Sequence, residues 1–128
     1  MRSSATYLSE ADCTTLVTER SGGMCEVRIS GICRGPGESR HHRNKASQGG
    51  LWMPSNVIHA CGSGTTGCHG WIEANPATAR RRGLWLFRGQ LPAEAPVMLV
   101  FRGLSGAYLL DDEGSIKWLS SRAVERLR

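Results

Sequence analysis

Hydrophobic and polar residues alternate along this chain in short blocks, and each block predicts one helix or strand. Residues 9–20 are typical of a helix, because a serine can cap the first turn, acidic side chains follow it, and two glycines come after the end. Cys13, Leu16 and Val17 give this helix an apolar face. We therefore expect Cys13 to be a small buried residue and not a ligand.

The middle of the chain predicts short strands followed by a helix. Residues 24–33 suit a hairpin or knuckle, residues 41–45 begin extended, and Val57 to Ala60 is typical of a second strand. A helix is expected from about Cys68 to Asn75, where a proline follows. Residues 77–82 either continue that helix after a kink or begin a new turn.

The last third of the chain predicts further strands and a final helix. Residues 84–87 are a strand candidate, and residues 97–102 and 107–110 suit a hairpin joined by a glycine-containing turn. Apolar positions that share one face predict a helix over residues 116–128. Strands and helices are therefore expected in one mixed, α+β arrangement.

The composition favours one small domain with a thin core. The chain has 128 residues, of which 40% are hydrophobic and only 6% aromatic, and its 16 glycines make it rich in loops. A metal cross-link would help such a chain to fold. The N-terminus has no apolar signal-peptide core, and no stretch is apolar enough to span a bilayer, so we expect a cytoplasmic protein without a membrane partner.

Four of the five cysteines form two spaced pairs, Cys25 with Cys33 and Cys61 with Cys68. In a reducing compartment, clustered cysteines indicate a metal more often than disulfides. Zinc prefers four ligands at tetrahedral angles, and glycines inside both wide loops let the chain bend back, so we predict a structural zinc ion. Four reduced cysteines without a metal are the alternative. The glycines before Cys68 should serve the turns of this knuckle, because Cys-His stands where a phosphate loop requires Lys-Ser/Thr.

The positive charge is concentrated on the same segment as the cysteines. Residues 25–88 carry nine basic and three acidic side chains, a net charge of +6, whereas residues 1–24 sum to −1 and residues 89–128 to zero. This distribution suits a polyanionic substrate. The alternative for any single arginine is a solvated basic surface.

The histidines between and beside the cysteines suggest a second metal site. His41 and His42 are adjacent, so in a strand one imidazole could hold a metal while the other stays free to act as a base. His69 and Glu73 are four residues apart and share one face of a helix, where they could grip one ion. Exposed histidines without a role, a solvated carboxylate at Glu73 and an ordinary turn amide at Asn56 remain the alternatives.

The order of these residues resembles the HNH endonuclease family, of the ββα-metal class. The resemblance rests on Cys25 and Cys33, His41-His42, Asn56, and Cys61 with Cys68-His69, and it covers roughly residues 19–76. Local sequences such as Gly67-Cys68-His69-Gly70-Trp71-Ile72 are similar to small HNH proteins of actinobacterial phages. The resemblance implies a ββα-metal core with a four-cysteine zinc knuckle and an N-terminal helix in residues 1–83. Residues 84–128 would add a β-hairpin and a helix packed on the same domain.

The resemblance also implies a role for each matching residue. His41 would be a metal ligand, and His42 the general base that deprotonates the attacking water. Asn56 would hold the loop and fix the orientation of His42. His69 would be a second ligand, and Glu73 stands where some members place a further one, often histidine. A carboxylate there favours Mg²⁺ or Mn²⁺, with Ni²⁺ and Zn²⁺ as alternatives.

The implied activity is metal-dependent hydrolysis of DNA phosphodiester bonds, by nicking or cutting. Basic side chains would hold the flanking phosphates, namely those of Arg43, Lys45, Arg80, Arg81 and Arg82. Phage HNH proteins often lie beside terminase genes, so a role in DNA packaging with terminase is also expected. His59 is expected to be structural. A zinc-stabilised DNA-binding module without catalysis, or a packaging-complex subunit that docks through residues 84–128, is the alternative function.

Overall fold

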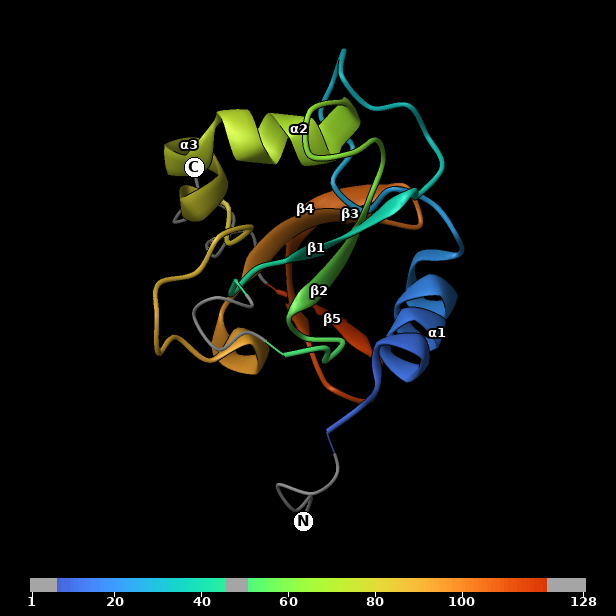
Figure 1. Cartoon of the computed structure of the whole chain (residues 1–128), viewed down its shortest axis with the longest axis vertical. Helices are drawn as coiled ribbons and strands as arrows, with labels where there is room; N and C mark the ends of the chain where they lie inside the picture. The colour runs from blue at the N-terminus through green and yellow to red at the C-terminus, as the bar shows by residue number, and fades with distance from the viewer. Residues whose placement is uncertain (1–6, 46–50, 120–128) are drawn as a thin grey trace.

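The structure is a computed structural model that describes residues 7–45 and 51–119 and has a mixed α/β fold (Figure 1). Two small antiparallel sheets lie beside one another, and helices cover their sides. The elements follow in the order α1 (Glu10–Ser21), β1 (Ser39–His42), β2 (Val57–Ala60), α2 (Gly67–Ala74), α3 (Pro76–Arg81), the 3₁₀ turn η3 (Pro92–Glu94), β3 (Val97–Phe101), β4 (Leu104–Leu110) and β5 (Ile116–Trp118).

Helix α1 forms where the sequence predicts it, and both of its ends carry the expected signals. The Ser9 side chain accepts a hydrogen bond from a backbone N–H of the first turn at 3.1 Å, and Gly22 closes the helix with a φ of 66°. Cys13 and Val17 are buried and pack with Val57 of β2. Cys13 therefore belongs to the core, as predicted.

Strands β1 and β2 and helix α2 form the central unit of the fold. The two strands pair antiparallel, with His41 opposite Ile58 and His42 opposite Val57. Helix α2 then begins with the first turn around Cys68, as the sequence predicts. The break between α2 and α3 falls at Asn75, whose φ of −129° and ψ of 58° end one helix before the next begins.

Strands β3, β4 and β5 form the second sheet, in that order. The predicted hairpin is present, but its turn is shorter than expected, and β4 already begins at Leu104. Arg102 and Gly103 have φ values of 50° and 80°. Two left-handed residues in succession are the geometry of the tight turns that match the twist of paired strands.

The strand expected at residues 84–87 is wrong. Leu84, Trp85 and Leu86 are buried, but they form an irregular segment. Gly83 bends the chain just before it with a φ of 75°, and a turn follows directly after it. The segment is therefore too short to pair with a neighbouring strand, and its succession of apolar residues reflects burial alone.

The helix expected over residues 116–128 is wrong where the structure describes it. Residues 116–118 form β5, which pairs with β4 so that Trp118 lies opposite Tyr108. The Trp118 ring covers Gly106, where a Cβ would collide with it. Cross-strand packing of this kind outweighs the helical spacing of apolar residues on which the predicted helix was based. Residues 120–128 lie outside the described part of the chain.

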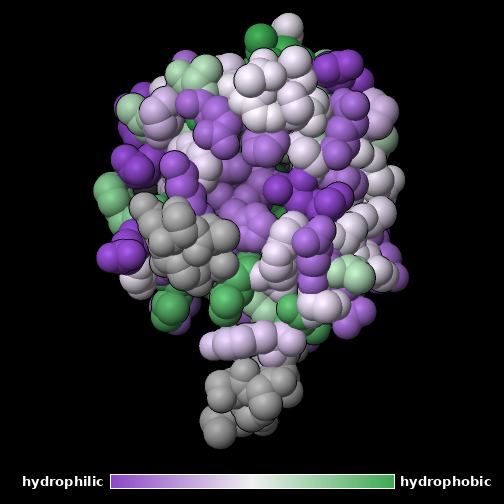
Figure 2. All heavy atoms as spheres, viewed as in Figure 1, coloured by the Kyte–Doolittle hydropathy of each residue, from purple (hydrophilic) through white to green (hydrophobic). Residues whose placement is uncertain are grey.

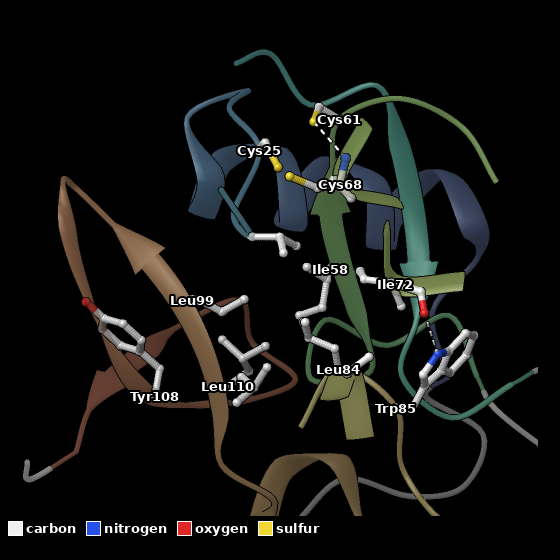
Figure 3. Close-up of a cluster of buried hydrophobic side chains, with 14 residues drawn as sticks. Cys25, Ile58, Cys61, Cys68, Ile72, Leu84, Trp85, Leu99, Tyr108 and Leu110 are labelled. Carbon is white, nitrogen blue, oxygen red and sulfur yellow. Dashed lines mark hydrogen bonds between the residues drawn. The ribbon is translucent and has the colours of Figure 1, made fainter. Parts of the chain in front are cut away.

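One hydrophobic core joins the two sheets (Figure 3). Leu99 and Leu110 from the second sheet point toward Ile58 of β2 and Leu84 of the irregular segment, and Ile72 of α2 lies beside them. Backbone hydrogen bonds of 2.8 to 2.9 Å also tie β3 to residues near the cysteines and α3. The second sheet therefore supports the elements that carry the histidines and cysteines.

Candidate functional site

Four cysteine side chains from separate segments meet at one end of the core, where Figure 3 labels Cys25, Cys61 and Cys68. Cys25 and Cys33 lie between α1 and β1, Cys61 follows β2, and Cys68 lies in the first turn of α2. Their sulfur atoms all lie within 4.8 Å of one another, and those of Cys33 and Cys61 are 3.9 Å apart. Sulfurs bound to tetrahedral zinc at about 2.3 Å would be separated by about 3.8 Å. The cluster is therefore positioned to hold a metal ion such as zinc.

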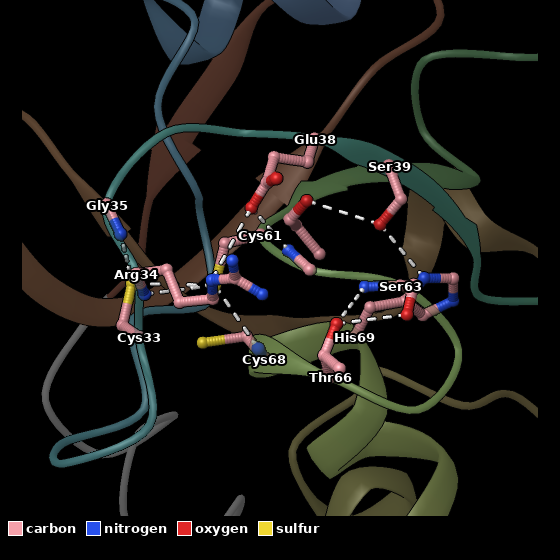
Figure 4. A network of polar contacts seen from close by, with 12 residues as sticks. Cys33, Arg34, Gly35, Glu38, Ser39, Cys61, Ser63, Thr66, Cys68 and His69 are labelled. Atoms are coloured by element: carbon pink, nitrogen blue, oxygen red, sulfur yellow. Dashed lines mark hydrogen bonds and ion pairs between the residues drawn. The ribbon is translucent and has the colours of Figure 1, made fainter.

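Backbone N–H groups surround the sulfur atoms (Figure 4). They donate from Ile29 to Cys68 at 3.3 Å, from Arg34 to Cys61 at 3.3 Å, from Gly35 to Cys33 at 3.4 Å and from Cys68 to Cys61 at 3.2 Å. Burial opposes ionisation of Cys61, but the N–H donors prevail and lower its pKa to about 7, whereas burial raises the pKa values of Cys25 and Cys68. Donors of this kind stabilise thiolates, the form of cysteine that binds metals.

The glycines before Cys68 shape the turns of the knuckle, as expected from the sequence. A Cβ at Gly62 would collide with the backbone of Thr66, and a Cβ at Gly67 with the backbone of Cys61. The backbone N–H of His69 then donates to the Cys61 carbonyl at 3.0 Å. The cysteine cluster thus fixes where α2 starts and where His69 stands.

A second group of possible metal ligands lies beside the cysteine cluster. His41 on β1 and His69 and Glu73 on α2 each offer one ligand atom, and these atoms lie within 4.8 Å of one another. The Nε2 atom of His69 is 3.8 Å from a Glu73 carboxylate oxygen, one helical turn away. The structure therefore brings together the three residues that the sequence analysis assigned to one ion.

Hydrogen bonds determine which nitrogen of each imidazole is free. Nε2 of His41 lies 2.6 Å from the carbonyl oxygen of Leu84, which can only accept, so Nε2 carries the proton and Nδ1 is free. Nδ1 of His69 lies 2.9 Å from Oγ of Ser39, whose own proton is directed to the Ala60 carbonyl at 3.3 Å. Nδ1 of His69 therefore donates to Ser39 (Figure 4), and its Nε2 faces Glu73 with a free lone pair.

Both imidazoles are kept neutral by their surroundings. Burial lowers the pKa of His41 to about 3, and burial also lowers the pKa of His69 against the opposing effect of Glu73. A neutral imidazole is the form that binds a cation. Two imidazole nitrogens and one carboxylate oxygen are a donor set that suits a divalent ion such as Mn²⁺ or Zn²⁺.

His42 lies outside this ligand group but lines the same cleft. The open cleft has a volume of about 350 Å³ and is lined by Arg40, His41, His42, Lys45, His69, Glu73 and Trp85. The His42 ring packs edge-on against Trp52, with ring centroids 4.4 Å apart. Burial lowers the pKa of His42, and no described residue hydrogen-bonds its Nε2. The Nε2 atom is itself buried, and its hydrogen-bonding capacity is unused among the described residues.

Asn56 closes the loop that joins β1 to β2. Its side-chain oxygen accepts from the Asn44 N–H at 2.8 Å, and its side-chain nitrogen donates to the carbonyls of Asn44 and Leu51, both at 3.1 Å. These bonds hold both ends of the loop, and they leave Asn56 only 2% exposed. Leu51 directly precedes Trp52, so Asn56 acts on His42 through the loop that carries Trp52.

Arg43 is not a surface residue, which corrects its assignment to phosphate binding. It is fully buried, and its guanidinium donates to the carbonyls of Gly83, Ser55 and Ala95 at 2.8 to 2.9 Å. Burial, reinforced by Arg20, lowers the pKa of Arg43 to about 9, so the group is still charged at neutral pH. A buried guanidinium held by carbonyls stabilises the fold and cannot reach a phosphate.

Among the other predicted basic residues, Lys45 lines the cleft, and most of them stack on aromatic rings. Lys45 lies 4.7 Å from the Trp85 ring centre, Arg80 lies 4.6 Å from Phe87, and Arg82 lies 5.3 Å from Trp71. Arg81 is exposed on α3 beside them. Hydrophilic side chains accordingly gather over the middle of the face that β1 presents (Figure 2).

The sequence analysis missed Arg40, which lines the cleft from β1. Its guanidinium lies 6.0 Å from the Trp52 ring and 3.7 Å from a Glu10 carboxylate oxygen. The sequence signal that could have indicated Arg40 was its position directly before His41, in a strand whose side chains alternate between two faces. His59, by contrast, has the structural role expected of it, because its ring lies 2.8 Å from the Ser21 hydroxyl and against Gly37.

Comparisons with known proteins leave the chain without a family assignment. No protein-family model, curated protein or solved structure matches it. Among the helices that the structure describes, none has the length and apolar character needed to cross a membrane. The chemistry of the cleft and of the cysteine cluster therefore carries the functional argument.

Proposed function

We propose that the chain is a metal-dependent endonuclease of the HNH type, which hydrolyses phosphodiester bonds of DNA. One observation carries this proposal: His41, His69 and Glu73 converge within 4.8 Å in a cleft that His42 also lines. The ligands come from a strand and a helix of one β1–β2–α2 unit, and the four-cysteine cluster lies at the start of that helix. This is the arrangement expected of a ββα-metal core.

The residues of the cleft would divide the chemistry between them. A divalent ion held by His41, His69 and Glu73 would offset negative charge on the scissile phosphate. His42 would take the proton of the attacking water at Nε2, which is buried and has no hydrogen-bond partner among the described residues. The lowered pKa of His42, caused by burial, keeps this nitrogen unprotonated and ready to accept near neutral pH.

Neighbouring residues would hold these groups in place. The Trp52 ring packs against His42 and limits its rotation, and Asn56 fixes the loop that presents Trp52. The Leu84 carbonyl and the Ser39 hydroxyl orient the rings of His41 and His69. Lys45 lines the cleft, and together with Arg81 and Arg82 at the end of α3 it would supply positive charges for flanking phosphates.

A plasmid nicking assay with Mg²⁺ or Mn²⁺ tests the proposal. His42→Ala should keep its zinc and its melting temperature, because His42 supports neither the cysteine cluster nor the ligand group. It should lower the nicking rate by about two to four orders of magnitude, the usual contribution of a general base. His69→Ala should instead weaken the apparent affinity for the divalent ion, and more Mn²⁺ should restore part of the rate.

Two outcomes would contradict the assignment. Nicking by His42→Ala at the wild-type rate would remove His42 as the base. A wild-type protein that binds DNA but never nicks it, with any of Mg²⁺, Mn²⁺, Ni²⁺ or Zn²⁺, would indicate a zinc-stabilised DNA-binding module. Ser39→Ala refines the test, because it should lower affinity for Mn²⁺ about tenfold through the orientation of His69 while leaving the ligand set intact.

A further inference from the structure

An exposed aromatic ring, that of Phe87, follows two residues after Trp85, which lines the cleft, and it has no role in the proposed chemistry. Phe87 is 62% exposed, and Leu91 is 59% exposed, within the short turn of residues 87–91. The turn is fixed by hydrogen bonds between Phe87 and Gln90 in both directions, at 3.0 and 3.1 Å, and by Gly89 with a φ of 85°. The Phe87 ring is therefore presented to solvent from an ordered turn.

The Phe87 ring is also held from one side by a cation. The guanidinium carbon of Arg80 lies 4.6 Å from the ring centre. Such a contact orients both groups, and it leaves the exposed part of the ring free for a second stacking partner. A ligand that has a planar aromatic group and a negatively charged backbone would stack on the ring and pair with the guanidinium at the same time.

The turn is attached directly to the strand that carries the histidines. Leu86 donates its backbone N–H to the carbonyl of Arg43 at 2.8 Å, and the Asn44 side chain donates to the carbonyl of Gln90 at 3.5 Å. Trp85, two residues before Phe87, lines the cleft itself. The Cα atom of Phe87 can lie no more than about 7 Å from that of Trp85, so a nucleic acid that extends beyond the cleft could reach this turn.

The charge around the ring favours a polyanion over a protein partner. Residues 76–93 contain four arginines and no acidic residue. Three of the arginines, Arg80, Arg81 and Arg82, stand at the end of α3, and Arg88 lies in the turn beside Phe87. Phosphates would contact these arginines, and a base would be available to the ring.

We infer that Phe87 and Arg80 form a stacking platform for an unpaired base of a single-stranded DNA segment next to the cleft. Bases in an intact duplex stack on one another and offer only their edges, so the platform selects DNA with an unpaired or displaced nucleotide. This inference rests on the proposed action on DNA and names the form of DNA that the cleft prefers.

Binding of labelled oligonucleotides tests the platform. The probes are a short thymidine single strand and a blunt duplex of the same length, and all proteins carry His42→Ala so that the probe is not cut. Phe87→Ala should weaken single-strand binding about 5- to 100-fold and leave duplex binding nearly unchanged. Phe87→Trp should retain single-strand binding, because tryptophan also stacks on bases.

Leu104→Ala is the matched control, since Leu104 is another exposed apolar side chain, at 54%, on the hairpin between β3 and β4. It should bind both probes like the parent protein. Unchanged single-strand binding by Phe87→Ala would overturn the platform, and so would an equal loss on both probes. If the wild-type protein nicks plasmid DNA but Phe87→Ala does not change single-strand binding, the platform alone is refuted. If Phe87→Ala weakens single-strand binding but the wild-type protein never nicks, the proposed catalysis alone is refuted.

Discussion

The buried guanidinium of Arg43 is held by carbonyls from three separate segments: the end of α3, the entry to β2 and the loop before β3. No carboxylate lies among its hydrogen-bond partners in the described part of the chain. Its charge is instead shared among carbonyl dipoles, which suits the forked geometry of an arginine better than the single point charge of a lysine. Loss of the fork would leave several buried carbonyls without donors.

We therefore predict that Arg43→Lys lowers the free energy of unfolding by about 2 to 4 kcal/mol, because each unsatisfied buried acceptor is costly. Urea denaturation measures the change. Arg81→Lys is the matched control, since Arg81 is exposed, and its effect should stay within about 0.5 kcal/mol. Equal stability of Arg43→Lys and the wild-type protein would contradict the structural role of Arg43.

Between elements, the cysteine cluster links the loop after α1, the end of β2 and the start of α2. Helix α2 also carries His69, and β2 pairs with β1, the strand that carries His41. Hydrogen bonds show the connection: His69 at the start of α2 bonds to Ser39 through its side chain and to Cys61 through its backbone N–H (Figure 4). The start of α2 therefore belongs to both the cysteine cluster and the cleft. Loss of the metal would therefore disturb the cleft as well as the knuckle.

Metal analysis should find about one tightly held zinc ion per chain, and chelation should unfold the protein, because structural zinc contributes about 10 kcal/mol or more, comparable to the whole stability of a small domain. Cys68→Ser should lose the zinc. Cys13→Ala should keep it, because Cys13 packs on β2, away from the cluster. A well-folded wild-type protein without any bound metal would contradict this prediction.

Over the whole molecule, the net positive charge is concentrated in residues 25–88, the segment that contains the cleft residues, and the rest of the chain is nearly balanced. The +6 of residues 25–88 includes the arginines of α3 and Lys45 beside the cleft, while residues 89–128 are neutral overall. The second sheet thus supports the core without adding net charge. Binding to DNA should accordingly depend on salt through a limited set of side chains.

Replacing Arg81 and Arg82 together by alanine should weaken DNA binding for every sequence and reduce the slope of log affinity against log salt by about one to two. Affinity measured over a series of salt concentrations gives the slope. Arg102→Ala with Lys117→Ala removes the same charge from the second sheet and should leave the slope nearly unchanged. Identical slopes for the two double variants would exclude the α3 arginines as phosphate contacts.

Local signals were sufficient for several elements and for the grouping of ligands. The capped helix α1, the short strand β2 and the start of α2 at the second cysteine pair could all be predicted, because each depends on neighbouring residues. The four cysteines and the trio of His41, His69 and Glu73 could likewise be grouped from residue type and spacing. Soft thiolates and imidazoles in such an order have few other uses.

The burial and the contacts of individual side chains were decided only by the tertiary structure. Arg43 is buried and Arg80 stacks on Phe87 because distant segments supply carbonyls to one and a ring to the other, which local sequence cannot specify. Residues 116–118 form a strand because β4 and Gly106 offer a partner for Trp118. The free nitrogens of the ligand histidines were likewise set by long-range contacts with a carbonyl and a hydroxyl. The sequence by itself determined which side chains could serve as metal ligands, and the long-range packing determined how they are oriented, because hydrogen-bond geometry exists only once the chain has folded.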